Sequence, residues 1–403
     1  MDNKKIKTIL NCEFCKNKPC LIGCPLDNDI PTSIKYIQNN KYEKAYETFL
    51  NTTILMSICG RICPQSNQCE GSCIKKGTKE LVKIGNIEEF IGDYGLENNL
   101  KDSIPIDTKH NVAVVGSGPS GLTCAYFLRK MGIGVTIFEK YDYLGGLLIH
   151  GIPSFRLPKE IVNNVISRIL SSGIEVKYKM ELGKNLKLDE LLKKYDAIYL
   201  GIGANVPNKL HINGEKLNGV YGGNTYLEKN INVELKDKVV IVIGGGDVAM
   251  DVSRTIAKHN PKKVIIMYRK SKKDMRANDK EIENAKKEGI EFMYYSTVIK
   301  INGRKKVNSV TYLDKKNNEN KMNCDYVFTA IGSHPENFIK KLNINLNPKG
   351  KVSIKRGGFT SNPKIFAGGD VAGVKSTVAW AARSGRDAAY SIYDFLNNKV
   401  DKS

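Results

Sequence analysis

The stretch VAVVGSGPSG, residues 112–121, is an apolar run that ends in three closely spaced glycines. A helical pattern, LTCAYFLRKMG, follows it, and a second apolar run, VTIFE, ends at Glu139. This order of strand, glycine turn, helix, strand and acid is typical of a dinucleotide-binding βαβ unit, with the acid accepting hydrogen bonds from ribose hydroxyls. Gly116, Gly118 and Gly121 would allow a tight turn and bring a pyrophosphate to the helix N-terminus. The alternative is an ordinary α/β domain with a glycine-rich turn.

A second unit with the same pattern begins with VVIVIGGGDV at position 239. Its G-x-G-x-x-A turn starts at Gly244 and Gly246, and its second strand, VIIMY, runs into Arg269 and Lys270. An acid is expected at this strand end when the ribose has a free 2′-hydroxyl, whereas a base fits a 2′-phosphate. With Arg276 six residues beyond Lys270, the pattern favours NADPH over NADH. The alternative is that the basic residues are merely exposed charges at the end of a strand.

Two such units on one chain suggest FAD in the first and NADPH in the second. A late segment, TSNPKIFAGGDVAGV, supports this assignment because a short apolar strand runs into Gly369 and Asp370. A carboxylate at that strand end is placed to bind the ribityl hydroxyls of a flavin. Asp370 could equally be the N-cap of the helix expected over the following residues.

Sulfur is concentrated at the start of the chain, where eight of the ten cysteines precede residue 74. They form two runs, C-x2-C-x4-C-x3-C-P from Cys12 and C-x3-C-P-x5-C-x3-C from Cys59. No apolar leader precedes them, so we expect a cytoplasmic protein with reduced thiols rather than disulfides. Close spacing that ends in Cys-Pro favours two [4Fe–4S] clusters. Structural zinc and free redox-active thiols are the alternatives.

Composition is that of a globular chain of two or three domains, with 403 residues and 41% hydrophobic residues. The formal net charge, 63 − 42 = +21, comes from lysines spread along the whole sequence. These lysines form no patch interleaved with aromatic residues, so we expect no nucleic-acid partner. No apolar run is long enough to span a membrane. Residues 33–52, between the two cysteine runs, have helical periodicity and predict a small α-helical module around the clusters.

Taken together, the motifs resemble the small subunit of bacterial glutamate synthase. This family includes the amino-terminal half of dihydropyrimidine dehydrogenase and the large subunit of the ferredoxin-linked NADPH transhydrogenase. The resemblance covers almost the whole chain and rests on the cysteine runs and on KIGNIEEFI, GGLLIHGIPSFRLPKEI, GGGDVAMD, YRKSKKDM and FAGGDVAG. It implies an α/β fold with two Rossmann-like domains, the NADP domain inserted into the FAD domain, behind an α-helical iron–sulfur domain. The expected boundaries are 1–107 for the iron–sulfur domain, 108–230 and 331–403 for the FAD domain, and 231–330 for the NADP domain.

The resemblance also implies ligands for each cofactor. One cluster would be held by Cys12, Cys15, Cys20 and Cys73. The other would be held by Cys24, Cys63 and Cys69, with Glu88 as a fourth, non-cysteine ligand and Cys59 spare, whereas spacing alone suggests eight cysteine ligands. Flavin contacts would come from Gly116, Gly118, Gly121, Glu139, Gly146, Leu147, Arg156, Gly369, Asp370 and Val378. NADP contacts would come from Gly244, Gly245, Gly246, Asp247, Arg269, Lys270 and Arg276.

The implied reaction is hydride transfer from NADPH to the flavin, followed by release of single electrons through the clusters. The acceptor would be a larger partner subunit that makes glutamate from glutamine and 2-oxoglutarate. Such chemistry requires no acid–base set, because the cofactors carry the reaction. Other acceptors remain open, namely ferredoxin in a transhydrogenase, polysulfide, or a pyrimidine reductase. A zinc-bearing, nucleotide-sensing module without turnover is the alternative from another class.

Two features depart from the family. Only eleven residues precede the first cysteine, where members usually have about thirty or more, and Lys270 stands where many have arginine. Lysine keeps the charge but loses the bidentate geometry of arginine.

Overall fold

The computed structural model describes residues 6–100, 102, 104–105, 109–229 and 231–397. These residues form two compact units. The first consists of Met1–Ile149, Ser154–Ala204 and Pro335–Ser403, and the second of His150–Pro153 and Asn205–His334. The boundaries expected at 107/108 and at 230 lie outside the described residues and stay predictions, as does the boundary at 330/331.

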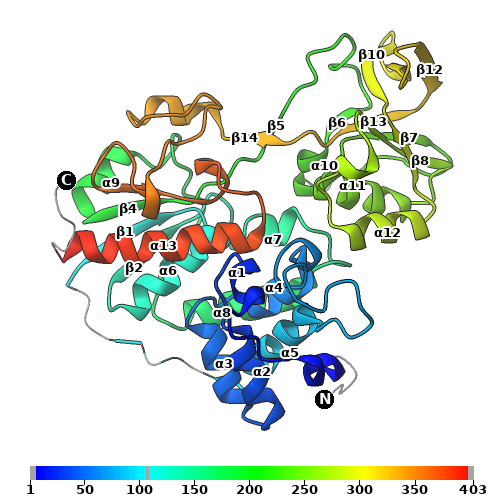
Figure 1. Ribbon diagram of the computed structural model, residues 1–403. Coiled ribbons are helices and arrows are strands. Elements are labelled where there is room, and N and C mark those ends of the chain that lie inside the picture. Colours follow the sequence, from blue (N-terminus) through cyan, green and yellow to red (C-terminus); the bar gives the residue numbers. More distant parts are fainter. Residues whose placement is uncertain (1–5, 101, 103, 106–108, 230, 398–403) are drawn as a thin grey trace. The chain divides into compact units, whose positions relative to one another are not determined.

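The amino-terminal part of the first unit is helical, as the sequence predicts (Figure 1). Helix α2 begins after Asp29, whose side chain accepts a hydrogen bond from the backbone N–H of Thr32, and it buries an apolar face. The backbones of helices α4 and α5 contact each other at Gly60. A Cβ atom at this position would lie only 2.3 Å from the backbone nitrogen of Glu89, so only glycine fits there. The helices are η1 (Lys7–Asn11), α1 (Pro19–Gly23), α2 (Ile30–Gln38), α3 (Tyr42–Leu50), α4 (Met56–Ile62), η2 (Gln65–Asn67) and α5 (Ile84–Glu97).

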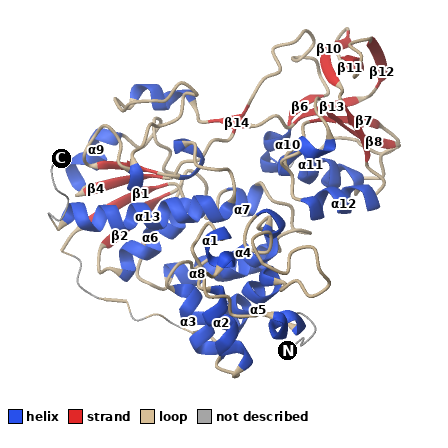
Figure 2. Ribbon diagram, in the orientation of Figure 1, coloured by secondary structure: helices blue, strands red, loops and turns tan. Residues whose placement is uncertain are grey.

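The rest of the first unit is built on a parallel five-stranded sheet in the order β15-β4-β1-β2-β3. Strands β4, β1 and β2 are labelled in Figure 2. Strand β15 comes from the far side of the second unit in the sequence, so the sheet is built from two separated segments, as the inserted arrangement requires. The strands are β1 (Asn111–Val115), β2 (Gly134–Phe138), β3 (Glu175–Lys177), β4 (Ala197–Leu200) and β15 (Ile365–Ala367). The helices are α6 (Pro119–Lys130), α7 (Leu147–His150), α8 (Lys159–Leu170), α9 (Leu188–Lys194), η4 (Asn337–Lys341), η5 (Arg356–Gly358), η6 (Gly369–Ala372) and α13 (Val378–Leu396).

The second unit has its own parallel sheet, in the order β6-β13-β7-β8-β9, and its own apolar core. An antiparallel sheet, β10-β11-β12, and the short pair β5-β14 complete it. The strands are β5 (Val206–Pro207), β6 (Val220–Gly222), β7 (Val239–Ile243), β8 (Lys263–Tyr268), β9 (Glu291–Tyr294), β10 (Thr297–Gly303), β11 (Val307–Leu313), β12 (Glu319–Asn323), β13 (Tyr326–Thr329) and β14 (Ser333–His334). The helices are α10 (Gly223–Lys229), α11 (Asp247–Ala257), η3 (Lys272–Asp274) and α12 (Asp279–Lys287).

The α/β class, with two parallel sheets behind a helical segment, is confirmed. None of the helices in the described part of the chain is long and apolar enough to cross a bilayer.

Candidate cofactor sites

The first glycine turn joins β1 to α6. Gly116 has φ of +95°, and a Cβ atom at Gly121 would lie 1.9 Å from the carbonyl oxygen of Gly116. Gly118 is the N-cap of α6, and a Cβ atom there would meet no protein atom within 4 Å. The outer glycines therefore shape the turn, while the middle one leaves the helix N-terminus open to a ligand. This arrangement fits a bound pyrophosphate.

Glu139 follows β2 and is buried beside this turn. Its carboxylate accepts hydrogen bonds from the backbone N–H and the hydroxyl of Ser117, at 2.9 and 2.5 Å, and from the backbone N–H of Tyr141 at 3.0 Å. A carboxylate offers about four acceptor positions. Glu139 is thus fixed in place and keeps capacity to accept hydrogen bonds from ribose hydroxyls.

The late segment meets the same turn from the other end of the chain. A Cβ atom at Gly369 would lie 3.0 Å from Cβ of Ser120, in the first turn of α6. The backbone N–H of Gly369 donates to Ser384 of α13 at 2.8 Å, and Ser384 in turn lies 3.1 Å from the Ser120 hydroxyl. Burial raises the pKa of the neighbouring Asp370, an effect that Lys351 and Ser376 oppose. Val378 begins α13.

Gly146 lies against the turn as well, because its Cβ atom would be 3.1 Å from Cα of Gly118. Leu147 begins α7 directly afterwards, and both Leu147 and Arg156 are half-buried. The structure thus brings Gly146 and Gly369 to the first turn of α6. The flavin contact of Arg156 stays a prediction.

The second glycine turn joins β7 to α11 and repeats the geometry of the first. Gly244 has φ of +151°, and a Cβ atom there would lie 2.2 Å from the carbonyl oxygen of Ala330. Gly246 is the N-cap of α11 and is open in the same way as Gly118. The carbonyl of Gly245 accepts a hydrogen bond from the backbone N–H of Arg276 at 2.9 Å. The second turn therefore also fits a pyrophosphate.

The three basic residues predicted to bind a 2′-phosphate lie beside this turn. Arg269 and Lys270 directly follow β8, and the Gly245 contact ties Arg276 to the turn. All three side chains are exposed, and none forms an ion pair within the described residues. Asp247, at the start of α11, accepts a hydrogen bond from the backbone N–H of Asn278 at 3.0 Å. Its carboxylate therefore fixes the loop that follows Arg276.

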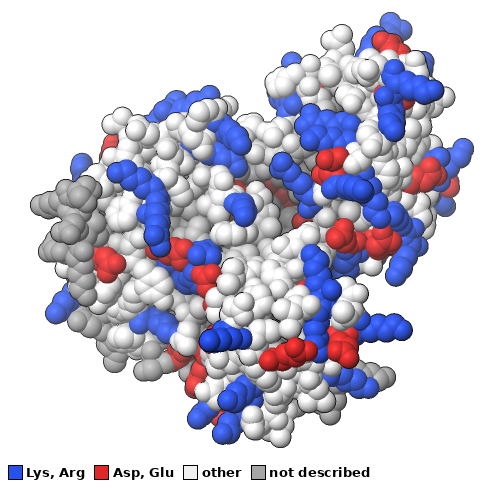
Figure 3. Space-filling model, in the orientation of Figure 1, with Lys and Arg blue, Asp and Glu red and all other residues white. Residues whose placement is uncertain are grey.

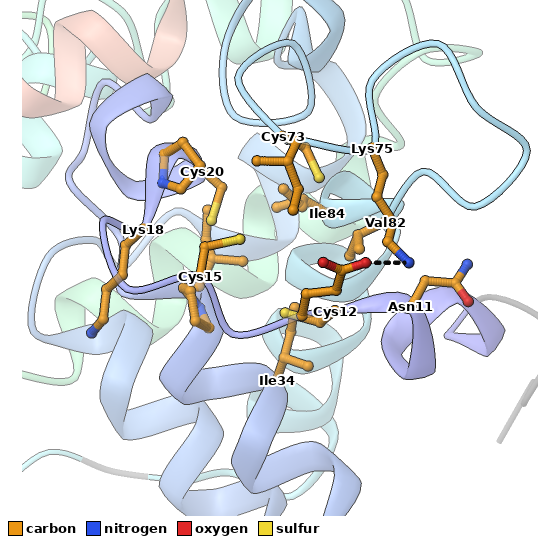
Figure 4. A pocket seen from close by; sticks show the side chains of 15 residues that line it. Asn11, Cys12, Cys15, Lys18, Cys20, Ile34, Cys73, Lys75, Val82 and Ile84 are labelled. Atoms are coloured by element: carbon orange, nitrogen blue, oxygen red, sulfur yellow. Dashed lines mark ion pairs between the residues drawn. The ribbon is translucent and has the colours of Figure 1, made fainter.

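The first group of cysteines lines one pocket near the N-terminus (Figure 4). Its four thiols are half-buried, and burial raises the pKa of Cys20 to about 11. The Lys75 ammonium beside them pairs with Glu13 at 3.0 Å. Ile34, Val82 and Ile84 supply apolar wall. The four thiols that share this pocket are Cys12, Cys15, Cys20 and Cys73, the set implied for one cluster.

The second group is deeper, and its members are Cys24, Cys59, Cys63, Cys69 and Glu88. Burial raises the pKa of Cys24 to about 12 and that of Glu88 to about 8. The Glu88 carboxylate accepts a hydrogen bond from the Asn28 side chain at 3.1 Å. Cys59 is fully buried and hydrogen-bonds to Cys63. Both candidates for a fourth ligand therefore lie in the group, and the choice between Cys59 and Glu88 stays a prediction.

Comparisons with known proteins agree with this arrangement. Residues 110–385 match the family of pyridine nucleotide-disulphide oxidoreductases, and residues 2–100 match domain II of dihydropyrimidine dehydrogenase, a 4Fe–4S cluster domain. The glutamate synthase [NADPH] small chain of Escherichia coli K12 is 34% identical over 96% of this chain and 90% of its own length.

The chain belongs to the glutamate synthase small-chain family. It is an electron-transfer oxidoreductase with a flavin- and nicotinamide-binding part and a 4Fe–4S part. The NAD-dependent dihydropyrimidine dehydrogenase subunit PreT of E. coli O157:H7 is also similar, at 29% identity over 97% of this chain and 94% of its own length. The solved structure of Mycobacterium tuberculosis FprA in complex with NADPH shares the fold, with a TM-score of 0.64 and 16% identity over 72% of this chain and 85% of that one.

The wider family is named for disulphide oxidoreductases, but the cysteines in the described part of this chain form no disulfide. All ten cysteines are free. Cys124 and Cys324, the only two beyond the helical segment, are buried in different units.

Among the described residues, no three His, Cys, Asp or Glu side chains converge closely enough to hold a single metal ion. This finding concerns single ions. The ligands of a four-iron cluster bind four different iron atoms.

Sequence reasoning missed several residues beside the second sulfur group. Asn28 donates to Glu88, and Arg383 and Arg386 of α13 contact the turn that follows Cys24. The only local signal was the polar run LDND directly after Cys-Pro.

Proposed function

We propose that this chain oxidises NADPH and passes the electrons through FAD and two [4Fe–4S] clusters to a larger subunit of glutamate synthase. In this proposal the larger subunit makes glutamate from glutamine and 2-oxoglutarate. The observation that carries the proposal is the presence, on one chain, of two open glycine turns and two separate sulfur groups. Its relatives named as glutamate synthase small chains span almost the same length.

FAD, when bound, accepts a hydride and releases electrons one at a time. The chain's own residues would place it. The α6 N-terminus at Gly118 would receive the pyrophosphate, Glu139 would accept the ribose hydroxyls, and Asp370 would accept the ribityl hydroxyls.

NADPH is favoured over NADH because of the unpaired cations at the second turn. A 2′-phosphate beside Arg269 and Arg276 would form charge-assisted hydrogen bonds with groups that lack other partners. Lys270 would add charge without bidentate geometry. No acid occupies the end of β8, where a carboxylate would favour a free 2′-hydroxyl.

The exit for electrons would be the first sulfur group, because its thiols are half-buried whereas those of the second group are buried. Four large apolar side chains lie exposed in the segments that carry these thiols. They are Leu10, Phe14, Ile22 and Ile74, with exposed fractions of 79, 43, 75 and 58%. Large exposed apolar side chains are often covered by a partner at a protein interface. We assign this surface to the larger subunit.

Lysines and arginines are interspersed with acidic residues over the visible face of the molecule (Figure 3). In the segments that carry the surface assigned to the larger subunit, hereafter the exit surface, the lysines at 16, 76 and 79 form no ion pair within the described residues. A partner surface with acidic residues around an apolar centre would complement it.

The decisive experiment is an anaerobic titration of the purified chain with NADPH and, separately, with NADH, with iron, sulfide and flavin assayed. We expect about eight iron atoms and one FAD per chain, and bleaching of the visible spectrum at lower concentrations of NADPH than of NADH. A colourless protein after reconstitution with iron, sulfide and FAD would refute the electron-transfer proposal.

The partner is tested by mixing the chain with the large glutamate synthase subunit of the same organism. Ile22→Ser and Ile74→Ser should slow glutamate formation while leaving NADPH-dependent ferricyanide reduction unchanged. Tyr178→Ser, which alters an exposed aromatic residue elsewhere in the first unit, is the matched control. Equal rates for all three variants would remove the exit surface from the proposal.

A pyrimidine-reducing partner is the second candidate, because the PreT relative matches over nearly its whole length. Electron transfer to a dihydropyrimidine dehydrogenase catalytic subunit, without transfer to the glutamate synthase subunit, would favour it.

A further inference from the structure

A turn directly after Cys24 links the second sulfur group to helix α13. Asp27 has φ of +56°, a left-handed conformation that non-glycine residues adopt rarely. The turn closes with a hydrogen bond from the Asp27 N–H to the Cys24 carbonyl at 3.1 Å. In this conformation the backbone N–H groups of Leu26 and Asn28 hydrogen-bond to the Cys24 sulfur.

Two arginines of α13 hold this turn from outside. Arg383 donates to the carbonyl of Pro25 at 2.8 Å and to the Asp27 carboxylate at 3.1 Å. Arg386, which is buried, donates to the carbonyl of Leu26 at 2.6 Å and also reaches Asp27 at 3.4 Å. The side chain and two carbonyls of the turn are thus bound by groups from a helix more than 350 residues further along the chain.

Asn28 extends the network to a second candidate ligand. It is fully buried, its amide donates to Glu88, and its side-chain oxygen accepts a hydrogen bond from the Thr52 hydroxyl at 2.5 Å. Arg386 also donates to the Thr52 carbonyl at 3.4 Å. The same arginine therefore supports the hydrogen bonds to both Cys24 and Glu88.

We propose that Asn28 and Arg386, with Arg383, are positioning residues that set the reduction potential of the cluster held by Cys24, Cys63 and Cys69. Hydrogen bonds to ligand atoms stabilise the more negative, reduced cluster and so raise its potential. The helix that supplies the arginines begins at Val378, in the flavin-binding part of the chain. Docking of that part therefore adjusts the cluster that is to receive its electrons. This inference rests on the proposed function.

The test is a redox titration of the reconstituted holoprotein, with each cluster followed by electron paramagnetic resonance. Asn28→Leu keeps the branched arrangement of four side-chain heavy atoms but removes the donor to Glu88. We expect the reduced-to-oxidised ratio of one cluster to fall about tenfold at a fixed potential, which corresponds to about 59 mV for a one-electron couple. The flavin and the other cluster should titrate as in the wild type.

Two substitutions at Arg386 separate charge from geometry. Arg386→Gln removes the positive charge and the paired donors of the guanidinium. Arg386→Lys keeps the charge but loses the paired donors. A positioning role predicts that both variants lower the potential of the same cluster that Asn28→Leu affects. A purely electrostatic role would leave Arg386→Lys at the wild-type potential and would overturn the proposal.

Arg254→Gln is the matched control, because Arg254 is also a buried arginine paired with carboxylates, Glu281 and Glu288, but lies in the second unit. It should leave both cluster potentials unchanged. If Asn28→Leu loses iron, the potentials of the two Arg386 variants test the proposal instead. Wild-type potentials in both variants at full iron content would refute it. Absence of the clusters themselves is distinguishable, because the wild-type protein would then show no cluster signal, and a different electron acceptor would leave these potentials unaffected.

Discussion

Replacing Gly246 by alanine is expected to weaken NADPH binding without destabilising the fold. A Cβ atom there meets no protein atom within 4 Å, and φ of −108° suits alanine as well as glycine. Gly244, two residues earlier in the same turn, has φ of +151°, and its Cβ atom would lie 2.2 Å from a backbone carbonyl oxygen. The same substitution therefore has different consequences at two positions of one turn.

The magnitudes follow from these distances. Gly246→Ala should change the free energy of unfolding by no more than about 0.5 kcal/mol. In the complex its methyl group would take space that the pyrophosphate needs, and overpacking of this kind costs about 1–3 kcal/mol. That is roughly a 5- to 150-fold rise in the Kd for NADPH. Gly244→Ala combines a clash of about 1–3 kcal/mol with backbone strain of about 1–2 kcal/mol, and should lower the free energy of unfolding by roughly 2–5 kcal/mol.

The assay pairs urea unfolding, followed by circular dichroism, with calorimetric titration of NADP⁺ into the same preparations. FAD content serves as an internal control, because neither substitution touches the first turn. Wild-type affinity in a folded Gly246→Ala variant would refute the argument, since it would show that no phosphate approaches this backbone.

Further predictions concern the other cofactor contacts and the helix packing. Arg269→Ala and Arg276→Ala should each raise the KM for NADPH about 10- to 150-fold, because a charge-assisted hydrogen bond contributes about 1.5–3 kcal/mol; an equal rise for NADH in steady-state assays would contradict a 2′-phosphate site. Glu139→Gln keeps the shape but loses the charge, so less FAD should survive gel filtration, and unchanged flavin content would argue against ribose binding. Gly385→Ala places a Cβ atom 2.1 Å from the carbonyl of Ser120 and should destabilise the fold by about 1–3 kcal/mol in urea; an unchanged urea midpoint would contradict tight packing of α13 on α6. Chelation of iron should lower the thermal stability of the amino-terminal helices while NADP⁺ affinity stays constant, because clusters stabilise only the part that binds them.

Both glycine turns could be predicted from sequence because their geometry is local. A positive φ at Gly116 and Gly244, and an open N-cap at Gly118 and Gly246, follow from residues that lie within one strand, turn and helix. The cations after β8 were predictable for the same reason. The fold class could be predicted because the same local unit of strand, glycine turn and helix occurs twice in the sequence.

The spacing of the cysteines in the sequence does not predict which of them lie together in the structure. Cys73 belongs to the second run in the sequence, yet it lines the pocket of the first run, because the segment between η2 and α5 forms part of that pocket's wall. The resemblance to a family implied that Cys73 joins the cysteines of the first run. Spacing alone would have assigned each run of four cysteines to its own cluster. The Arg386 contact with Leu26 was still less accessible, because it joins residues 360 positions apart.

The two candidates for the fourth ligand of the second group are brought there in different ways, one by local helix geometry and one by packing between helices. Cys59 lies on α4, and Cys63, four residues later, is the C-cap of the same helix, so local helical geometry brings the two residues to one side. Glu88 reaches the same place only because Gly60 allows the backbone of α5 to approach α4. A larger residue at position 60 would push α5 away and leave Cys59 as the nearer candidate. The presence of glycine there, between the two cysteines, is therefore the sequence feature that favours Glu88.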